Sequence, residues 1–134
     1  MRVRIRFFLA CAALLLCLTA KAASDSYDVF VPISKYLSTG DSESLSAWFA
    51  DNLEISIMSS TNDSSRNQAK QIIKTFFAAH TPRSFEINHT ASRTNSKYAL
   101  GYLNAGGEMF EVTIFVSKSK DRYLIQQLKI DRIR

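Results

Sequence analysis

The sequence predicts an α+β fold in which amphipathic helices cover one face of an antiparallel sheet. Three observations support this prediction. Apolar residues recur at helical spacing in the first half of the chain, and they alternate with polar residues in the second half. The alternating segments are long and separated by short turns, as in antiparallel sheets. The predicted order is helix, helix, strand, helix and then four strands (α-α-β-α-β-β-β-β), with the helices covering the apolar face of the sheet.

The amino end has the three parts of a secretory signal peptide. Arg2, Arg4 and Arg6 precede an uncharged run over residues 7–20, and Ala20-Lys21-Ala22 supplies an A-x-A cleavage site. The run is shorter than the ~20 residues that a membrane-spanning helix requires. We therefore expect residues 1–22 to be removed, no stable membrane insertion after cleavage, and export to the periplasm or out of the cell.

Cleavage leaves residues 23–134, which we expect to form a single domain. Both cysteines of the sequence precede residue 23, so this domain must be stabilised by its core without disulfides. The formal net charge is +5, but removing the four bases of residues 1–22 leaves 13 Lys and Arg against 12 Asp and Glu. The near-neutral balance gives no argument for a nucleic-acid partner.

The first two helices are predicted around a proline, a glycine and an aspartate. Pro32 is tolerated only in a first turn, so the first helix begins between residues 29 and 32. Gly40 ends it, and Asp41 can cap a second helix that runs into residues 51–52. The buried faces contain Phe30, Ile33 and Leu37 in the first helix and Leu45, Trp48 and Phe49 in the second.

A strand, a loop and a third helix follow. Residues 53–58 alternate between apolar and polar side chains, as a half-buried strand does, and the polar residues 59–64 are predicted as a loop. Ser65 and Gln68 have the spacing of a capping box, which starts the third helix. This helix ends at residues 80–82. Its buried face contains Ala69, Ile72, Ile73, Phe76 and Phe77.

The last four segments read as strands. Residues 104–107 contain two adjacent glycines that suit a hairpin turn, and residues 117–121 turn the chain again. The residues that share one face of each strand are Phe85, Ile87 and His89 in the first, Tyr98, Leu100 and Tyr102 in the second, Phe110, Val112, Ile114 and Val116 in the third, and Leu124, Gln126, Leu128 and Ile130 in the fourth.

Residues 37–55 resemble the opening of the nuclear transport factor two-like superfamily, which includes cystatin-like, polyketide cyclase-like and ketosteroid isomerase-like domains. The shared pattern is Gly40-Asp41, Leu45, and then the run 49–52 (Phe-Ala-Asp-Asn) before a strand. The later elements match in order, so the resemblance covers nearly all of residues 23–134. It implies a strongly curved sheet wrapped around helices, with a cone-shaped hollow. More narrowly, the chain is similar to a family of small exported bacterial proteins catalogued as a domain of unknown function.

The sequence departs from the enzymes of this superfamily at one position. In ketosteroid isomerase-like enzymes, the proton-transferring aspartate lies eight residues after the aromatic residue of the motif. The corresponding residue here is Ile57, which can neither take nor give a proton. The sequence also lacks a His-Glu-x-x-His pair, a Gly-x-Ser-x-Gly elbow and a phosphate-binding glycine loop. We therefore expect no metal and no cofactor.

The candidate ligand-binding residues are four polar side chains on otherwise apolar strand faces: His89, Tyr98, Tyr102 and Gln126. If those faces line the hollow, the four side chains offer a ligand convergent polar contacts. The alternative is that each is a core or rim residue whose polar tip meets the backbone or water.

Three functions remain open. We expect a non-enzymatic exported domain that binds an unknown small apolar ligand or an envelope protein through its concave pocket or its sheet surface. The alternative is a lyase, isomerase or hydrolase in which His89 is the acid or base and Tyr98 or Tyr102 donates a hydrogen bond; it requires His89 to point into an open cavity. A third interpretation is a homodimer through the outward face of the sheet. The apolar residues predicted on that face are Met109, Phe115, Tyr123 and Ile125.

Overall fold

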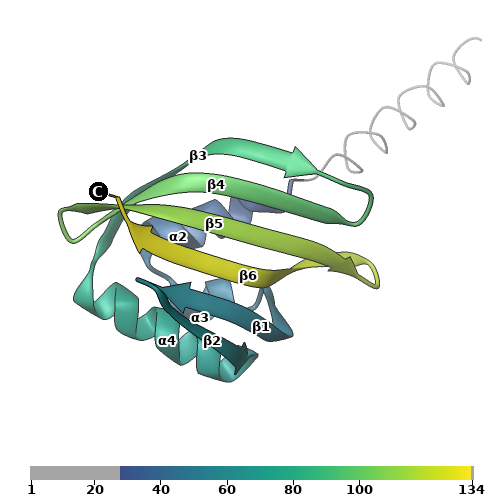
Figure 1. Ribbon diagram of the computed structural model, residues 1–134, viewed down its shortest axis with the longest axis horizontal. Helices are drawn as coiled ribbons and strands as arrows, with labels where there is room; N and C mark the ends of the chain where they lie inside the picture. Colours follow the sequence, from purple (N-terminus) through teal and green to yellow (C-terminus); the bar gives the residue numbers. More distant parts are fainter. Residues whose placement is uncertain (1–27, 134) are drawn as a thin grey trace, which may run out of the picture.

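The computed structural model describes residues 28–133 (Figure 1). The predicted signal peptide, residues 1–22, lies outside these residues. No helix within the described part of the chain is long and apolar enough to cross a membrane. In chain order the elements are α2 (Phe30–Thr39), α3 (Ser42–Ser46), β1 (Phe49–Ile57), β2 (Ser60–Ser65), α4 (Arg66–Ala79), β3 (Pro82–Ser92), β4 (Ser96–Ala105), β5 (Glu108–Ser119) and β6 (Arg122–Arg132).

The six strands form one sheet, and the helices lie on one face of it (Figure 1). The strand order is β2-β1-β6-β5-β4-β3. Every neighbouring pair is antiparallel except β1 and β6, which run parallel. The predicted α+β fold is confirmed, and the order of elements agrees with the prediction apart from one additional strand, β2.

Three predicted helix termini, the end of α2 and the starts of α3 and α4, are confirmed by their hydrogen bonds. Gly40 ends α2 in the left-handed conformation, with φ 70°. The carboxylate of Asp41 accepts a 3.0 Å bond from the Ser44 backbone N–H at the start of α3, and this bond lowers the pKa of the Asp41 carboxyl below its usual value. Ser65 and Gln68 form the expected reciprocal capping box at the start of α4.

Two boundaries differ from the prediction. The second helix stops at Ser46, and β1 already begins at Phe49, before the predicted start at residue 53. Residues 60–65, predicted as part of a loop, pair with β1 as the edge strand β2. This strand was hidden because only Ser64 in it is buried, so the side chains show no apolar alternation and only the backbone pairing defines it.

The β1–β2 turn has an unusual backbone. Met58 and Ser59 both adopt positive φ values, 50° and 72°, which are disfavoured for residues with a Cβ. The turn is fixed to the sheet by a 2.7 Å bond in which the Met58 N–H donates to the Ile130 carbonyl. The sharp turn therefore carries local strain that tertiary contacts hold in place.

The core fills the space between the helices and the sheet. The rings of Phe76 in α4 and Phe110 in β5 meet edge to face, with centroids 5.2 Å apart. Because large side chains occupy this layer, the hollow implied by the resemblance is packed in its centre. The largest fully buried side chains are Ile33, Leu37, Leu45, Phe49, Ile55, Ile73, Leu103, Phe110, Ile114, Ile125, Leu128 and Ile130.

Strand β4 has one face toward the helices and one face away from them. Ala99, Leu103 and Ala105 are fully buried, whereas Tyr98, Leu100 and Tyr102 are half-buried on the opposite face, which we call the helix-free face. The three predicted residues thus share one face, but it is not the face that meets the helices.

Gly101 lies on the face of β4 that meets the helices. A Cβ at Gly101 would lie 2.5 Å from the Glu86 carbonyl oxygen and 2.7 Å from the Phe85 ring. The close approach of β3 and its aromatic ring leaves no room for a side chain at this position. The tyrosines of β4, Tyr98 and Tyr102, therefore lie on the helix-free face.

Two bulges change which side chains face the helices. Residue 88 is the extra residue of β3, because Ile87 pairs with Gly101 while His89 pairs with Leu100. Residue 126 is likewise the extra residue of β6. The prediction that Tyr123 and Ile125 face outward is wrong: Ile125 is fully buried and Tyr123 packs against the core.

We predict that Gly101→Ala destabilises the domain by about 2 kcal/mol or more, because the added methyl group overpacks the contact with Phe85 and Glu86. Chemical unfolding followed by circular dichroism measures the change. Gly107→Ala is the control, since nothing lies within 4 Å of its Cβ and its φ is +80°, so it carries only the backbone penalty of about 1 kcal/mol. Equal losses in the two variants would contradict the packing argument.

We predict that Ser59→Gly stabilises the domain by about 0.5 kcal/mol, because glycine adopts the positive φ of this turn without steric strain. Ser60→Gly is the matched control in the adjacent strand, where glycine is expected to cost about 0.5–1 kcal/mol. Thermal unfolding of both variants beside the unmodified chain checks the signs. A lower midpoint for Ser59→Gly would show that the turn is not strained.

Candidate functional site

An apolar groove lies between α4 and the β1–β2 hairpin, and we call it the α4 groove. It is open to solvent and has a volume of about 440 Å³. Its floor and walls come from elements that meet only through tertiary packing. The lining residues are Ile57, Met58, Ser60 and Asn62 from the hairpin, Ile72, Thr75, Phe76 and Ala79 from α4, and His80 directly after α4.

Ile57 lies in this groove, at the position where the superfamily resemblance would place a proton-transferring carboxylate. Its aliphatic side chain gives the wall an apolar surface instead. Met58 follows it in the strained turn, so the left-handed backbone sets the Met58 side chain at the groove. A flexible thioether there suits adaptable apolar contact.

His80 is the one ionisable side chain in the lining of the α4 groove. Its ring lies 5.0 Å from the Phe76 ring and 5.3 Å from the Phe110 ring, measured between centroids. The His80 backbone N–H caps α4 through a 2.8 Å bond to the Phe76 carbonyl. The imidazole is thus held by aromatic packing at a helix end, as the sequence position suggested.

An ion pair between Arg132 and Glu108 lies near His80. The Nε of Arg132 donates a 2.8 Å hydrogen bond to Glu108, and this bond lowers the pKa of the Glu108 carboxyl below its usual value. The positive charge that His80 can carry acts on Glu108 in the same direction. The charged groups near His80 therefore include the carboxylate of Glu108, which is already paired with Arg132.

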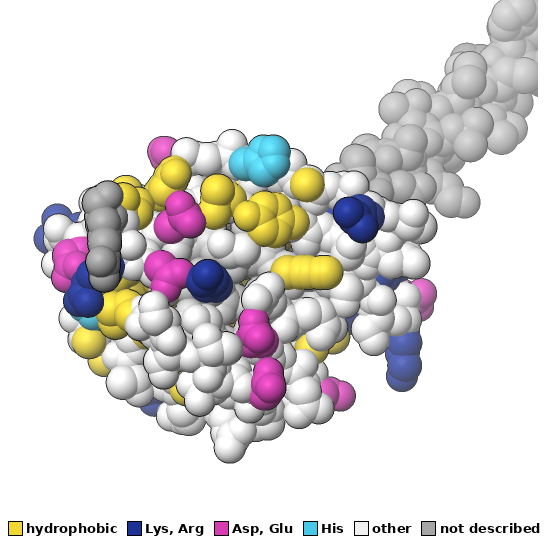
Figure 2. Space-filling model, in the orientation of Figure 1, with side chains coloured by type: hydrophobic (Ala, Val, Ile, Leu, Met, Phe, Trp, Pro, Cys, Tyr) yellow, Lys and Arg dark blue, Asp and Glu magenta, His cyan; other side chains and the backbone are white. Residues whose placement is uncertain are grey.

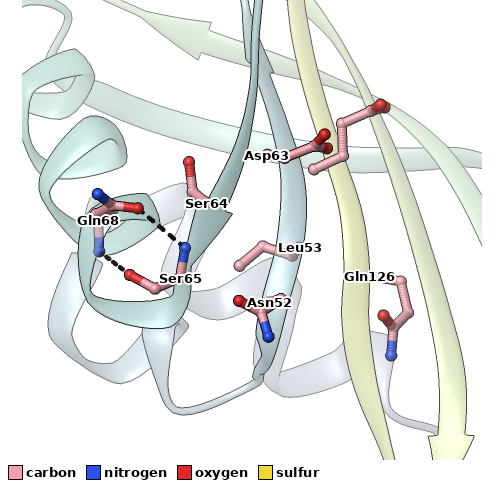
Figure 3. A pocket seen from close by; sticks show the side chains of 8 residues that line it. Asn52, Leu53, Asp63, Ser64, Ser65, Gln68 and Gln126 are labelled. Atoms are coloured by element: carbon pink, nitrogen blue, oxygen red, sulfur yellow. Dashed lines mark hydrogen bonds between the residues drawn. The ribbon is translucent and has the colours of Figure 1, made fainter.

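A second groove, of about 510 Å³, is polar (Figure 3). It lies where β1 and β6 lose register between Phe49 and Glu54. Asn52 and Gln126 lie across it from one another (Figure 3). The full lining is Asn52, Leu53, Glu54, Asp63, Ser64, Ser65, Gln68 and Gln126.

Two carboxylates stand side by side on adjacent strands in the polar groove, because Glu54 pairs with Asp63. Like charges directly opposite each other destabilise a sheet, and the amide of Gln127 offsets this by donating a hydrogen bond to Glu54. Within residues 28–133 no group of three or more His, Cys, Asp and Glu side chains is arranged to hold a metal ion. This groove therefore offers hydrogen bonds to polar ligands.

The structure brings three of the four predicted site residues together, on the helix-free face. His89 pairs with Leu100, whose neighbours on the same face of β4 are Tyr98 and Tyr102. Figure 2 shows this face, where apolar side chains gather among charged ones. Gln126 lies two strands away and lines the polar groove. The four side chains therefore do not converge on one cavity.

His89 is exposed to solvent on this face. The enzymatic alternative requires His89 to point into an open cavity beside a tyrosine, and this geometry is not present. The α4 groove escaped the sequence interpretation because one of its walls is the β1–β2 hairpin, which was predicted as a strand followed by a loop. The available signal was the width of the apolar face of α4, where Ile72 is half-buried and lines the groove.

Comparison with known proteins places the chain in a family. Residues 30–131 match the family described as "Domain of unknown function (DUF4783)". Comparison with curated proteins yields no match. A solved DUF4783 family protein from Bacteroides uniformis is 25% identical, with a TM-score of 0.77 over 80% of this chain and 99% of that chain.

Other solved structures agree. A DUF4783 family protein from Bacteroides ovatus is 25% identical, with a TM-score of 0.75 over 78% of this chain and 94% of that chain. A cystatin-like domain of unknown function from Nostoc punctiforme shares 12% identity and the fold, with a TM-score of 0.62 over 77% of this chain and 72% of that chain. With its curved six-stranded sheet and helices on one face, the chain belongs to the DUF4783 family and has the NTF2-like, cystatin-like fold.

Proposed function

We propose that this chain is an exported, non-enzymatic domain that binds a small apolar ligand in the α4 groove. The observation that carries the proposal is the composition of the groove. Most of its lining surface is apolar, although four of the nine lining residues, Ser60, Asn62, Thr75 and His80, have polar side chains. A volume of about 440 Å³ falls within the range of small-molecule sites.

The lining indicates what kind of ligand fits. The side chains of Ile57, Ile72 and Phe76 favour an apolar body, because burying apolar surface stabilises a complex by about 25 cal/mol per Å². The hydroxyl of Thr75 already donates to the Gln71 carbonyl at 2.9 Å. Ser60, Asn62 and His80 remain as candidate partners for a single polar group on the ligand.

The groove supports binding better than catalysis. General acid–base chemistry needs a proton-active group within reach of the reacting atom, and Ile57 supplies none at the usual reaction point of the fold. His80 is packed between two phenylalanine rings and has no second ionisable side chain beside it in the lining. A ligand in this groove would meet surfaces that hold it without activating it.

Export is supported by the predicted signal peptide. Cleavage after residue 22 is expected when the full chain is expressed in a bacterium with an intact secretion pathway. Mass spectrometry of the purified product gives the new amino terminus. Recovery of the intact chain from the cytosol alone would rule out export by this signal.

We predict that the neutral fluorophore N-phenyl-1-naphthylamine binds the α4 groove saturably and that Ile72→Glu weakens its binding about tenfold or more. The new carboxylate would have to lose water beside the apolar body of the probe. Fluorescence titration measures the affinity, and circular dichroism shows that the variant is folded.

The control is Lys74→Glu, which adds negative charge on an exposed position of the same helix outside the groove lining. Its affinity for the probe is expected to match that of the unmodified chain. Unsaturable fluorescence, or an equal loss in both variants, would eliminate the α4 groove as the binding site.

A further inference from the structure

The cations of the domain gather at one end of the sheet. The β3–β4 turn and the β5–β6 turn lie side by side there, because the Lys118 N–H donates a 2.8 Å bond to the Asn95 carbonyl. The two turns and the strand ends beside them hold five Lys and Arg side chains and one acid, Asp121, whereas the rest of residues 28–133 holds seven Lys and Arg and ten Asp and Glu. We call this end the basic tip, formed by Arg93, Lys97, Lys118, Lys120 and Arg122.

The charge of the basic tip is not neutralised by carboxylates. The ion pairs found within residues 28–133 are Arg66–Asp51, Lys70–Glu43, Lys129–Asp131 and Arg132–Glu108. None of these pairs involves a residue of the tip. The near-neutral balance of the domain therefore conceals a local excess of positive charge, which attracts anions from solution.

Aromatic rings hold two of these cations in place. The Nζ of Lys97 lies 4.9 Å from the centroid of the Tyr123 ring, and the guanidinium carbon of Arg122 lies 5.2 Å from that of Trp48. A ring face orients a cation but leaves its N–H donors available on the other side. Arg122 also donates a 3.4 Å hydrogen bond to the Ala47 carbonyl. The tip thus presents cations that neighbouring groups hold in position.

A pocket of about 260 Å³ opens beside the tip. Arg93 and Ser96 supply its donors, and Tyr98 and Phe115 supply an apolar wall. Lys97 also lines the pocket, although its ammonium lies over the Tyr123 ring. Tyr98 and Phe115 are cross-strand partners on the helix-free face, and both are half-buried. Cationic and aromatic surfaces therefore meet within one small cavity.

We propose that this pocket binds an organic anion, a phosphate or carboxylate carried on an apolar body. The guanidinium of Arg93 and the hydroxyl of Ser96 bind the anionic group, and the rings of Tyr98 and Phe115 contact the apolar body. The ammonium of Lys97, held over the Tyr123 ring, adds positive charge nearby. Lys118, Lys120 and Arg122 raise the local concentration of anions without touching the ligand. The same chemistry serves a soluble amphiphile and the headgroup of an anionic lipid.

This site is separate from the α4 groove. The basic tip lies at the start of β6, whereas the turn that borders the α4 groove is bonded to Ile130 near the end of β6. The two sites also favour ligands of different charge, a neutral ligand in the α4 groove and an anion in the tip pocket. The α4 groove has one ionisable side chain in its lining, whereas Arg93 and Lys97 line the tip pocket. Failure of one proposal leaves the other intact.

The test is isothermal titration of the full chain with octyl phosphate, and with inorganic phosphate to isolate the contribution of the apolar body. Octyl phosphate is expected to bind about tenfold or more tightly than inorganic phosphate. The double variant R93E/K97E is expected to lose tenfold or more of the octyl phosphate affinity, because the contact with Arg93 and the nearby charge of Lys97 both become repulsive. Equal affinities for the two probes would overturn the role of Tyr98 and Phe115.

The matched control is R83E/K74E, which makes the same change of charge at two exposed residues outside the tip. It is expected to keep the affinity for octyl phosphate. Co-sedimentation with phosphatidylcholine vesicles, with and without phosphatidylglycerol, then distinguishes the sources. Loss of anionic-vesicle binding in R93E/K97E alone assigns a lipid headgroup, and octyl phosphate binding without vesicle binding assigns a soluble anion. The proposal is overturned if neither probe binds or if both double variants lose affinity equally.

Discussion

The parallel pairing of β1 with β6 is the contact on which the rest of the structure depends. It joins the β1–β2 hairpin to the four-stranded antiparallel part of the sheet, and its register pairs Ile55 with Leu128 and Ile57 with Ile130. All four of these residues except Ile57 are fully buried. The pairing connects segments about seventy residues apart in the sequence, so the entropy of closing that loop must be offset by the core formed on top of it. Without this contact, the β1–β2 hairpin, which forms one wall of the α4 groove, would not belong to the sheet.

Local chemistry predicted the local features of the fold. Gly40, Asp41 and the Ser65–Gln68 pair mark helix ends through hydrogen bonds to residues within four positions, and such bonds need no tertiary information. The glycines at 106 and 107 mark a hairpin for the same reason, since both adopt positive φ. Features defined by distant partners were missed. β2 is a strand only because β1 lies beside it, and the face of β4 that meets the helices is decided by the Phe85 ring over Gly101.

The candidate site could be predicted only in part from the sequence, because it also depends on contacts between residues that are distant in the chain. Alternation singled out His89, Tyr98 and Tyr102 as polar side chains on apolar strand faces. The structure brings the three together on the helix-free face, because the bulge at Asn88 turns His89 away from the face of Phe85. Alternation alone cannot say which surface is covered, and each bulge reverses the assignment for the residues beyond it. Ile57 was informative in the opposite sense. Its identity argued against proton transfer before any geometry was known, and its position in an apolar groove is consistent with that argument.

The sheet does not close on itself, so β2 and β3 leave two free edges. A free edge invites a strand of a neighbouring molecule to add on and start an aggregate. β2 discourages this because it is six residues long, polar, and carries the charged Asp63. β3 is longer, but its bulge at Asn88 interrupts the row of backbone donors and acceptors, and Arg83 and Glu86 place charges along it. The irregularities that obscured the strand pattern thus also protect the chain from fibrillar association at high concentration.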